Sequence, residues 1–282
     1  MKRFLLSSLL LLGASIFAAD AKVNEKADKP MTIGSFNIRC PGDKAPNTWE
    51  ERIPRIVKVL DKYDFDIVGL QEVAAVQLDK LLKKTSYRSI GVARDDGIRK
   101  GEFSCIFYRK DRFDKLSYGT FWLSETPDKV GSVSWNSACR RICTWAKFRD
   151  RKTGKIFFFF NTHLDHRSAE ARLEGTRLIL KRINEIAGKA PVMLTGDFNN
   201  NFGEPYQLTV KTLQDAWVTG KGPEARATFT GYRESRLKEP TACIDYIFIT
   251  PGIQVDRILC AHDRFDGFPS DHDPVVATVR LP

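Results

Sequence analysis

The run Phe157-Phe158-Phe159-Phe160, within the stretch 156–161, restricts the fold more than any other feature of the sequence. Successive side chains of an extended strand point to opposite faces. Four consecutive phenylalanines therefore make both faces of this strand apolar. A strand of this kind is typical of sheets that are covered on both sides. We therefore expect a sheet that lies between two other layers.

The other elements alternate in a way that predicts an α/β fold. Apolar residues recur at helical spacing over 48–63 and 168–186, and Thr48 and Glu51 can form a capping box. Because proline is tolerated best in the first turn of a helix, we expect the regular helix to begin only at Pro54. Short helices are expected at 76–84 and 206–213, and strands at 31–38, 65–72, 87–93, 103–109, 117–123, 142–148, 191–195, 242–250 and 274–281. This order favours two packed sheets with helices on their outer faces.

Residues 1–21 have the pattern of a secretory signal peptide. Two basic residues precede a mostly apolar run over 4–17, and small residues around position 20 offer a cleavage site. The apolar run is shorter than the roughly 20 residues of a membrane span. We expect an exported protein, periplasmic or secreted, with no stable membrane insertion after cleavage; an uncleaved anchor is the alternative. A loose lead-in over 22–30 and one domain over 31–282 are expected to follow.

Charge and cysteine content narrow the class further. The formal net charge of +10 favours an anionic partner, although the basic residues are spread along the chain and also fit an ordinary soluble surface. Six cysteines permit disulfides in an exported chain, but no CxxC pair is present, so a structural zinc site is not expected. Cys105, Cys243 and Cys260 stand in apolar runs and are expected in the core.

Polar residues that suit metal or phosphate chemistry stand at the ends of six strand-like segments. They are Asn37 in SFNI, Glu72 in LQE, His163 in NTHLD, Asp197 and Asn199 in GDFN, Asp245 in IDYIF, and Asp271 and His272 in SDHDPV. Each alone has an ordinary explanation as a turn residue, a buried histidine or an ion-pair partner. A carboxylate at the mouth of a sheet can also bind a metal or accept a proton, and an amide can hold an oxyanion. Six such segments in one chain favour a catalytic site.

With these segments in this order, the sequence resembles the endonuclease/exonuclease/phosphatase family of metal-dependent phosphoesterases. GDFN followed by SDHxPV is highly specific, LQE and NTHLD are moderately specific, and the resemblance covers about residues 31–282. It implies a four-layered α/β/β/α sandwich of two mostly antiparallel sheets flanked by helices. It also implies hydrolysis of phosphate esters with Mg²⁺ or Mn²⁺. The stretch 121–127 looks like an exported bacterial subgroup related to the carbon-catabolite-repressor, nocturnin and deadenylase branch.

The resemblance also implies roles for the matching residues. Glu72 is similar to the principal metal ligand, with Asn37 and Asp271 beside it, and such oxygen ligands suit Mg²⁺. Asp197 is similar to the residue that orients or deprotonates the attacking water. Asn199 is similar to the phosphate-binding amide, and His163 and His272 match two histidines at the phosphate. His272 serves either as a phosphate contact or as a base, and the number of metal ions, one or two, stays open.

Three further residues are implied as supports. An acid behind each histidine would fix its tautomer, and the matching acids are Asp245 for His272 and Glu102 for His163. Arg141 precedes a strand at a position where the family carries a phosphate-contacting arginine, and the adjacent Arg140 is the alternative. A planar guanidinium suits phosphate.

The expected activity is hydrolysis of a phosphate ester by in-line attack of an activated water. Nucleic acid or nucleotides are the leading substrate class, and small phosphorylated metabolites such as sugar or inositol phosphates are the alternative. A module that binds phosphate ligands without turnover is a third hypothesis. Trp122 or Trp135 could stack a base, or serve only in packing. A long open basic groove would favour a polymer and a closed pocket a small molecule. We expect a monomer.

Overall fold

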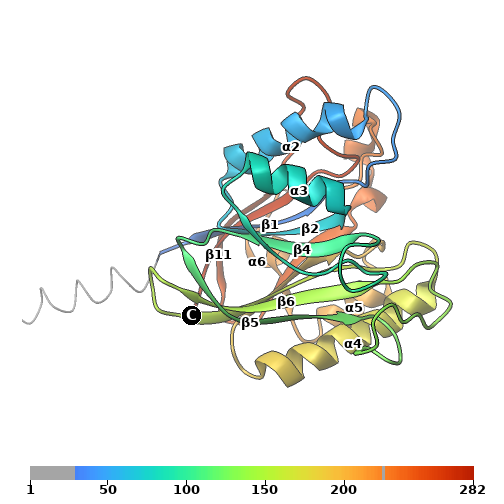
Figure 1. Cartoon of the computed structure of the whole chain (residues 1–282). Coiled ribbons are helices and arrows are strands. Elements are labelled where there is room, and N and C mark those ends of the chain that lie inside the picture. The colour runs from blue at the N-terminus through green and yellow to red at the C-terminus, as the bar shows by residue number, and fades with distance from the viewer. Residues whose placement is uncertain (1–28, 224–225) are drawn as a thin grey trace, which may run out of the picture.

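The computed structural model describes residues 29–223 and 226–282. The expected signal peptide, and all of the expected lead-in except residues 29–30, lie outside the described residues. Figure 1 shows four layers, with α2 and α3 over the first sheet and α4 and α5 under the second. The expected α/β sandwich of two sheets flanked by helices is thereby confirmed.

The first sheet has the strand order β11-β12-β1-β2-β4-β3. Its strands are β1 (Met31–Asn37), β2 (Ile67–Val73), β3 (Arg88–Ile90), β4 (Phe103–Tyr108), β11 (Gln254–Cys260) and β12 (Val275–Arg280). β1 and β2 run parallel, and the other neighbours run antiparallel. β11 is not among the strands expected from sequence, because Gln254, Asp256 and Arg257 are exposed and its apolar residues do not alternate clearly with polar ones.

The second sheet has the order β5-β6-β7-β8-β10-β9. Its strands are β5 (Phe113–Trp122), β6 (Ile142–Asp150), β7 (Ile156–His163), β8 (Val192–Asp197), β9 (Gln214–Asp215) and β10 (Asp245–Ile249). β7 and β8 are parallel, and the remaining pairs are antiparallel. Each sheet is therefore mostly antiparallel with one parallel pair at its centre.

The phenylalanine run lies in β7 and contributes to two separate cores. Phe157 and Phe159 pack in the core between the two sheets, with residues such as Ile33 from the first sheet. Phe158 and Phe160 pack on the opposite face, in the core between the second sheet and α4. All four phenylalanines are buried. The expectation of a strand between two layers is confirmed.

The helices cover the outer faces. They are α2 (Trp49–Tyr63), α3 (Ala75–Lys84), α4 (Ala169–Ala187), α5 (Glu204–Thr209) and α6 (Ala216–Thr219), with 3₁₀ turns at Glu234–Lys238 and Pro240–Ala242. The capping box of Thr48 and Glu51 is present. The expectation that regular helix begins only at Pro54 is wrong, because α2 already begins at Trp49. Pro54 lies on the exposed side, so water can reach the Glu50 carbonyl that its missing N–H leaves unpaired.

The cysteines and the helices test two further expectations. All six cysteines are free thiols, and Cys105, Cys243 and Cys260 are buried as expected. Over residues 29–223 and 226–282, no helix is both long and apolar enough to cross a membrane.

Candidate active site

Strand direction brings the polar segments to one edge of the sandwich. β1 and β2 are parallel, and so are β7 and β8, so Asn37, Glu72, His163 and Asp197 leave their sheets at carboxyl ends. β10 runs antiparallel to β8 and pairs Asp245 with Asp197, which places its first residue at the same edge. Side chains far apart in the sequence therefore meet because of the strand topology.

Asp197 lies at the centre of this group and is buried. Its Oδ2 accepts a hydrogen bond from Asn37 Nδ2 at 2.9 Å, and its Oδ1 accepts one from the Asn199 backbone N–H at 2.8 Å. The Nε2 atoms of His163 and His272 lie 3.4 and 3.8 Å from Asp197 Oδ2. Burial, and next the charge of Asp245, raise the pKa of Asp197 above its ordinary value. A carboxylate with a raised pKa is suited to accept a proton near neutral pH.

Glu72 is held beside Asp197 by the same amide. Asn37 Nδ2 also donates to Glu72 Oε1 at 3.0 Å, and the backbone N–H of Cys40 donates to Glu72 Oε2 at 3.1 Å. Burial opposes ionisation of Glu72, but the Asn37 hydrogen bond, then the charge of His272 and the Cys40 hydrogen bond, lower its pKa below the ordinary value. Glu72 has a positive φ of 58°, and the register between β2 and β4 shifts between Leu70 and Val73. This irregularity at the end of β2 positions an ionised carboxylate at the sheet edge.

The donor set around Glu72 fits a hard divalent cation. Ligand atoms of Glu72, His163 and Asp197 all lie within 4.8 Å of one another. Arg39 Nη1 lies 3.7 Å from Glu72 Oε2, and Arg39 Nε lies 3.8 Å from Asp271 Oδ2, so Asp271 stands at the same place. Ionised carboxylate oxygens are the ligands that Mg²⁺ and Mn²⁺ prefer. The Oδ1 atom of Asn37 accepts a hydrogen bond from the backbone N–H of Arg39. Its Nδ2 atom donates to the carboxylates of Glu72 and Asp197 and so links them.

His272 is paired with an acid, as expected. Its Nδ1 donates to Asp245 Oδ2 at 2.8 Å, and both residues are buried. Burial opposes the charged imidazole, but the neighbouring Asp245 carboxylate raises the pKa of His272 well above its ordinary value. The raised pKa favours the charged ring, and its second nitrogen, Nε2, lies 3.8 Å from Asp197 Oδ2.

The expected contact between Glu102 and His163 does not form. Glu102 instead binds Arg94 through two hydrogen bonds, of 2.6 and 3.1 Å. His163 Nε2 lies 2.9 Å from Asn199 Nδ2, and among the described residues its buried Nδ1 has no hydrogen-bond partner. Burial, and next the positive charge of Arg141, lower the pKa of His163 well below its ordinary value. The lowered pKa favours the neutral form of His163. Arg94, which is not among the site residues expected from sequence, pairs with the Glu102 carboxylate.

Arg141, and not Arg140, lies in the site. Arg140 is half-exposed and donates to the Gly131 carbonyl. Arg141 is buried, and its Nη1 has no hydrogen-bond partner in the described part of the chain. A buried guanidinium with free donors at a pocket wall is suited to bind an anion.

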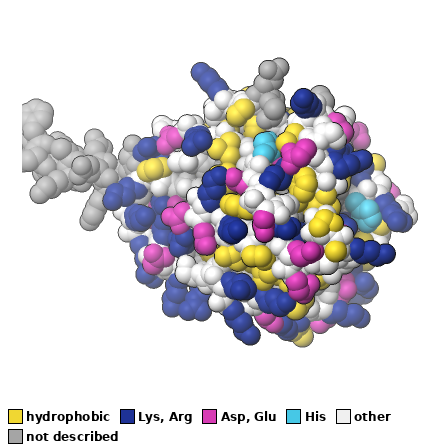
Figure 2. Space-filling model, turned by 90° about the horizontal axis from the view of Figure 1, so that it is seen from above, with side chains coloured by type: hydrophobic (Ala, Val, Ile, Leu, Met, Phe, Trp, Pro, Cys, Tyr) yellow, Lys and Arg dark blue, Asp and Glu magenta, His cyan; other side chains and the backbone are white. Residues whose placement is uncertain are grey.

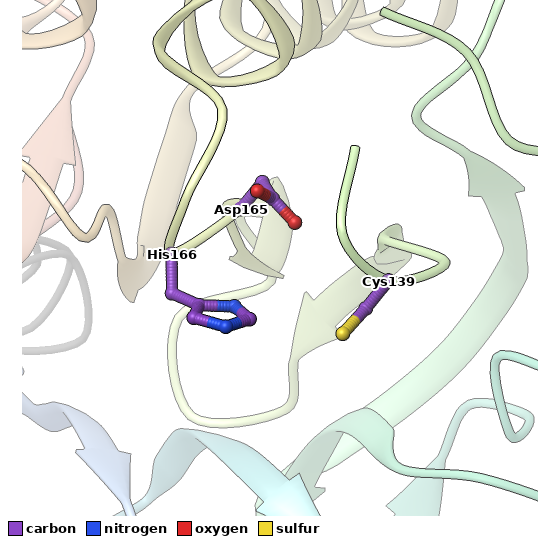
Figure 3. Close-up of side chains that lie close together, drawn as sticks. All are labelled: Cys139, Asp165 and His166. Carbon is purple, nitrogen blue, oxygen red and sulfur yellow. The ribbon is translucent and has the colours of Figure 1, made fainter. Parts of the chain in front are cut away.

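Asp165 and His166 hold Arg141 in place. Arg141 Nε lies 3.6 Å from Asp165 Oδ2, and Arg141 Nη2 lies 3.0 Å from His166 Nδ1. Figure 3 shows Asp165, His166 and Cys139 around a common space, a grouping that could in principle bind a metal. Asp165, however, already accepts hydrogen bonds from Ser137, Ala138, Arg167 and Ser168. Its role here is to position a loop and a guanidinium.

These side chains line one pocket of about 270 Å³. The site residues expected from sequence that line it are Glu72, Glu102, Arg141, His163, Asp197, Asn199, Asp271 and His272. Its wall also contains residues that the sequence reading did not select: Arg39, Cys40, Arg94, Cys139, His166, Phe229 and Ile244. Two of these residues could have been selected from the sequence, because they lie close to expected site residues. Arg39 follows Asn37 by two positions, and His166, one of four histidines, follows His163 by three.

Neither tryptophan considered for base stacking lines this pocket. Trp122 is buried, and its Nε1 donates to the Arg94 carbonyl at 2.6 Å. Trp135 lines a separate cavity beside α4. The aromatic ring in the pocket wall is that of Phe229, which packs on His272 with ring centroids 4.9 Å apart.

Comparison with known proteins agrees with this geometry. A model of the Endonuclease/Exonuclease/phosphatase family matches residues 34–272. Drosophila melanogaster nocturnin is 29% identical over 300 residues, and tyrosyl-DNA phosphodiesterase 2 of Bos taurus is 24% identical over 251 residues. These matches cover 89% and 83% of this chain but only 45% and 64% of the two relatives. A solved structure of a Bacteroides thetaiotaomicron mannosyl-6-phosphatase is 35% identical, with a TM-score of 0.84, and covers 89% of this chain and 100% of its own.

Proposed function

Because this chain belongs to the endonuclease/exonuclease/phosphatase family, we propose that it is a metal-dependent phosphatase of small phosphate monoesters. The observation that carries this proposal is the pocket of about 270 Å³, which buries the site residues and is walled by charged side chains. Pockets of this size suit small ligands. The similarity to a mannosyl-6-phosphatase over that protein's whole chain supports the same substrate class.

The residues can divide the reaction among them. Asp197 accepts the proton of the attacking water, as its buried position and raised pKa favour. His272, whose charged form is favoured by Asp245, donates a hydrogen bond to a phosphoryl oxygen. Arg141 and Asn199 bind the remaining phosphoryl oxygens, since both line the pocket. Phosphoryl transfer depends mainly on such positioning and charge neutralisation.

Glu72 and Asp271 would hold Mg²⁺ or Mn²⁺, and Asn37 would orient Glu72. When bound, the metal ion supplies positive charge to the phosphoryl group and orients it for attack. The ionised state of Glu72 suits this role. Arg39 balances the charge of the same two carboxylates from the side.

A nuclease or phosphodiesterase is the second candidate function, although the sequence alone favours it. Two observations favour it: the net charge of +10 and the similarity to tyrosyl-DNA phosphodiesterase 2. The small size of the pocket, about 270 Å³, favours the phosphatase over the nuclease. Figure 2 views the molecule from the side of α2 and α3, and on that face the basic side chains are interspersed with acidic and apolar ones and form no continuous basic track. A polymer substrate would be expected to use such a track.

Hydrolysis by the purified protein with Mg²⁺ or with EDTA tests the proposal. The substrates are mannose 6-phosphate, glucose 6-phosphate, single-stranded RNA and DNA, and bis-p-nitrophenyl phosphate. We expect Mg²⁺-dependent phosphate release from the sugar phosphates and little cleavage of the polymers. Preferential cleavage of RNA or DNA would instead support the nuclease. No turnover of any substrate with any divalent metal would support the non-catalytic binding module.

We also propose that the protein is exported, on the basis of the N-terminal sequence alone. N-terminal sequencing of the mature protein after cell fractionation tests this. A mature chain that starts near residue 22 and is found outside the cytoplasm is the expected result. A full-length cytoplasmic chain would contradict it.

A further inference from the structure

The pair formed by Arg94 and Glu102 lies in the pocket wall but has no part in the reaction described above. The two side chains are 16% and 22% exposed, and they face each other through two parallel hydrogen bonds. Such a two-pronged pair is geometrically well defined. We propose that it recognises hydroxyl groups on the leaving part of the substrate, which makes a polyhydroxylated phosphate ester the preferred substrate. This inference rests on the proposed phosphatase function.

The backbone holds this pair rigidly beside the catalytic centre. Glu102 directly precedes β4, and the β4 residue Phe103 pairs with Val73, the neighbour of Glu72. Burial is the largest cause of the raised pKa of Glu102, and the negative charge of Glu72 also raises it. Glu102 is thus one strand away from the expected metal ligand. Glu72, Arg94 and Glu102 line the same pocket, so a leaving group held there can reach the pair.

Arg94 is fixed from three directions. Its backbone N–H donates to the Glu102 carbonyl at 3.0 Å, and its own carbonyl accepts from Trp122 Nε1 at 2.6 Å. Ala93 and Phe103 form an isolated antiparallel bridge next to both residues. A pair held in this way is pre-organised and does not have to be ordered when a ligand binds.

The chemistry of the pair matches a hydroxyl group. After its two bonds to Arg94, the Glu102 carboxylate keeps lone pairs that can accept hydrogen bonds, and Arg94 keeps N–H donors. A hydroxyl both donates and accepts, so neighbouring hydroxyls can bind the carboxylate and the guanidinium together. An apolar leaving group would cover these charged groups without replacing their bonds to water, and such a mismatch is costly.

A matched pair of substrates tests this inference directly. Mannose 6-phosphate and cyclohexylmethyl phosphate both carry the phosphate on a primary carbon attached to a six-membered ring, but the second lacks hydroxyl groups. We expect the wild-type kcat/KM to be about ten- to a hundredfold higher for a hexose 6-phosphate, the range given by one or two hydrogen bonds to charged groups. Glucose 6-phosphate and galactose 6-phosphate are included so that the result does not depend on one sugar.

Glu102→Gln and Arg94→Lys should each remove most of this preference. The matched control is Asp79→Asn. Asp79 lies in α3 and pairs with Arg99, which is in the same loop as Arg94, but Asp79 does not line the pocket. The control should keep the wild-type preference. Thermal unfolding of each variant reports folding, and Arg94→Lys provides an independent test if Glu102→Gln does not fold.

Two results would overturn the inference, and they can be told apart. If the wild type hydrolyses both esters equally well, or the variants lower both kcat/KM values equally, the phosphatase function stands and hydroxyl recognition by this pair is wrong. If the wild type hydrolyses neither ester but cleaves a polymer, the proposed function and the inference fall together.

Discussion

The imidazole of His272 lies between two carboxylates, with Nδ1 2.8 Å from Asp245 Oδ2 and Nε2 3.8 Å from Asp197 Oδ2. The first carboxylate fixes the ring and its charge, and the second lies at the centre of the pocket. Burial opposes the imidazolium, yet Asp245 raises the pKa of His272 well above its ordinary value. This shift favours the charged ring, which can donate a hydrogen bond to a phosphoryl oxygen.

Replacement of Asp245 tests this relationship. In Asp245→Asn we expect the pKa of His272 to fall towards its ordinary value, because the compensating charge is lost while burial remains. As the pH rises, the His272 ring of the variant would lose its proton at a lower pH than the wild-type ring. The value of kcat at neutral pH should therefore fall by about a hundredfold. NMR titration of the His272 ring and the pH profile of kcat measure both effects. Asp256→Asn, at a surface ion pair with Arg280, is the control. An unchanged pKa of His272 would count against the assignment.

Glu72 is expected to dominate metal binding. Glu72→Gln keeps the shape of the side chain but removes an ionised oxygen ligand, so Mn²⁺ affinity should fall at least about tenfold. Titration calorimetry with Mn²⁺ measures the affinity, and excess metal should restore part of the activity. EDTA should abolish wild-type turnover. Equal Mn²⁺ affinity in Glu72→Gln and the wild type would place the metal elsewhere.

Asp165 should make stability depend on pH in the acid range. Burial opposes its charge, but hydrogen bonds from Ser168 and Arg167 and the charge of Arg141 lower its pKa from 3.8 to about 2. A pKa that is lower in the folded state contributes stability that is fully present above pH 3.8 and is lost as the pH falls towards 2. The contribution is about 2 kcal/mol.

Denaturant unfolding between pH 6 and pH 2 checks this effect. Asp165→Asn should be less stable than the wild type at pH 6, and the difference should shrink as the pH falls. The variant should also raise KM, because Arg141 loses its nearby carboxylate. A stability difference that stays constant with pH would mean that the charge of Asp165 contributes nothing.

The sequence predicts most of the layers and most of the site, for a physical reason. Asp197 ends the apolar strand β8 and Asn199 lies two residues beyond it, so their place at a sheet edge follows from the strand itself. The phenylalanine run likewise requires cover on both faces. These features are local in sequence, and strand direction then brings them together.

The features that the sequence does not predict correctly depend on contacts between segments that are distant in the chain. The resemblance predicts that Glu102 supports His163, but the chain turns back over residues 94–102 and places Arg94 beside Glu102. The positions of Phe229 and Cys139 in the pocket also depend on long loops with no periodic signal. Helix preference alone places Pro54 in a first turn, whereas its exposure to solvent makes the missing N–H tolerable inside α2.

The most direct test of the central claim is phosphate release from mannose 6-phosphate in Mg²⁺ by the wild type and by Asp197→Asn. Asp197 has its carboxylate at the centre of the site, within reach of both histidines. We predict Mg²⁺-dependent turnover by the wild type and a loss of about a thousandfold in the variant, with the fold retained by circular dichroism. Normal turnover by a folded Asp197→Asn protein would contradict the account.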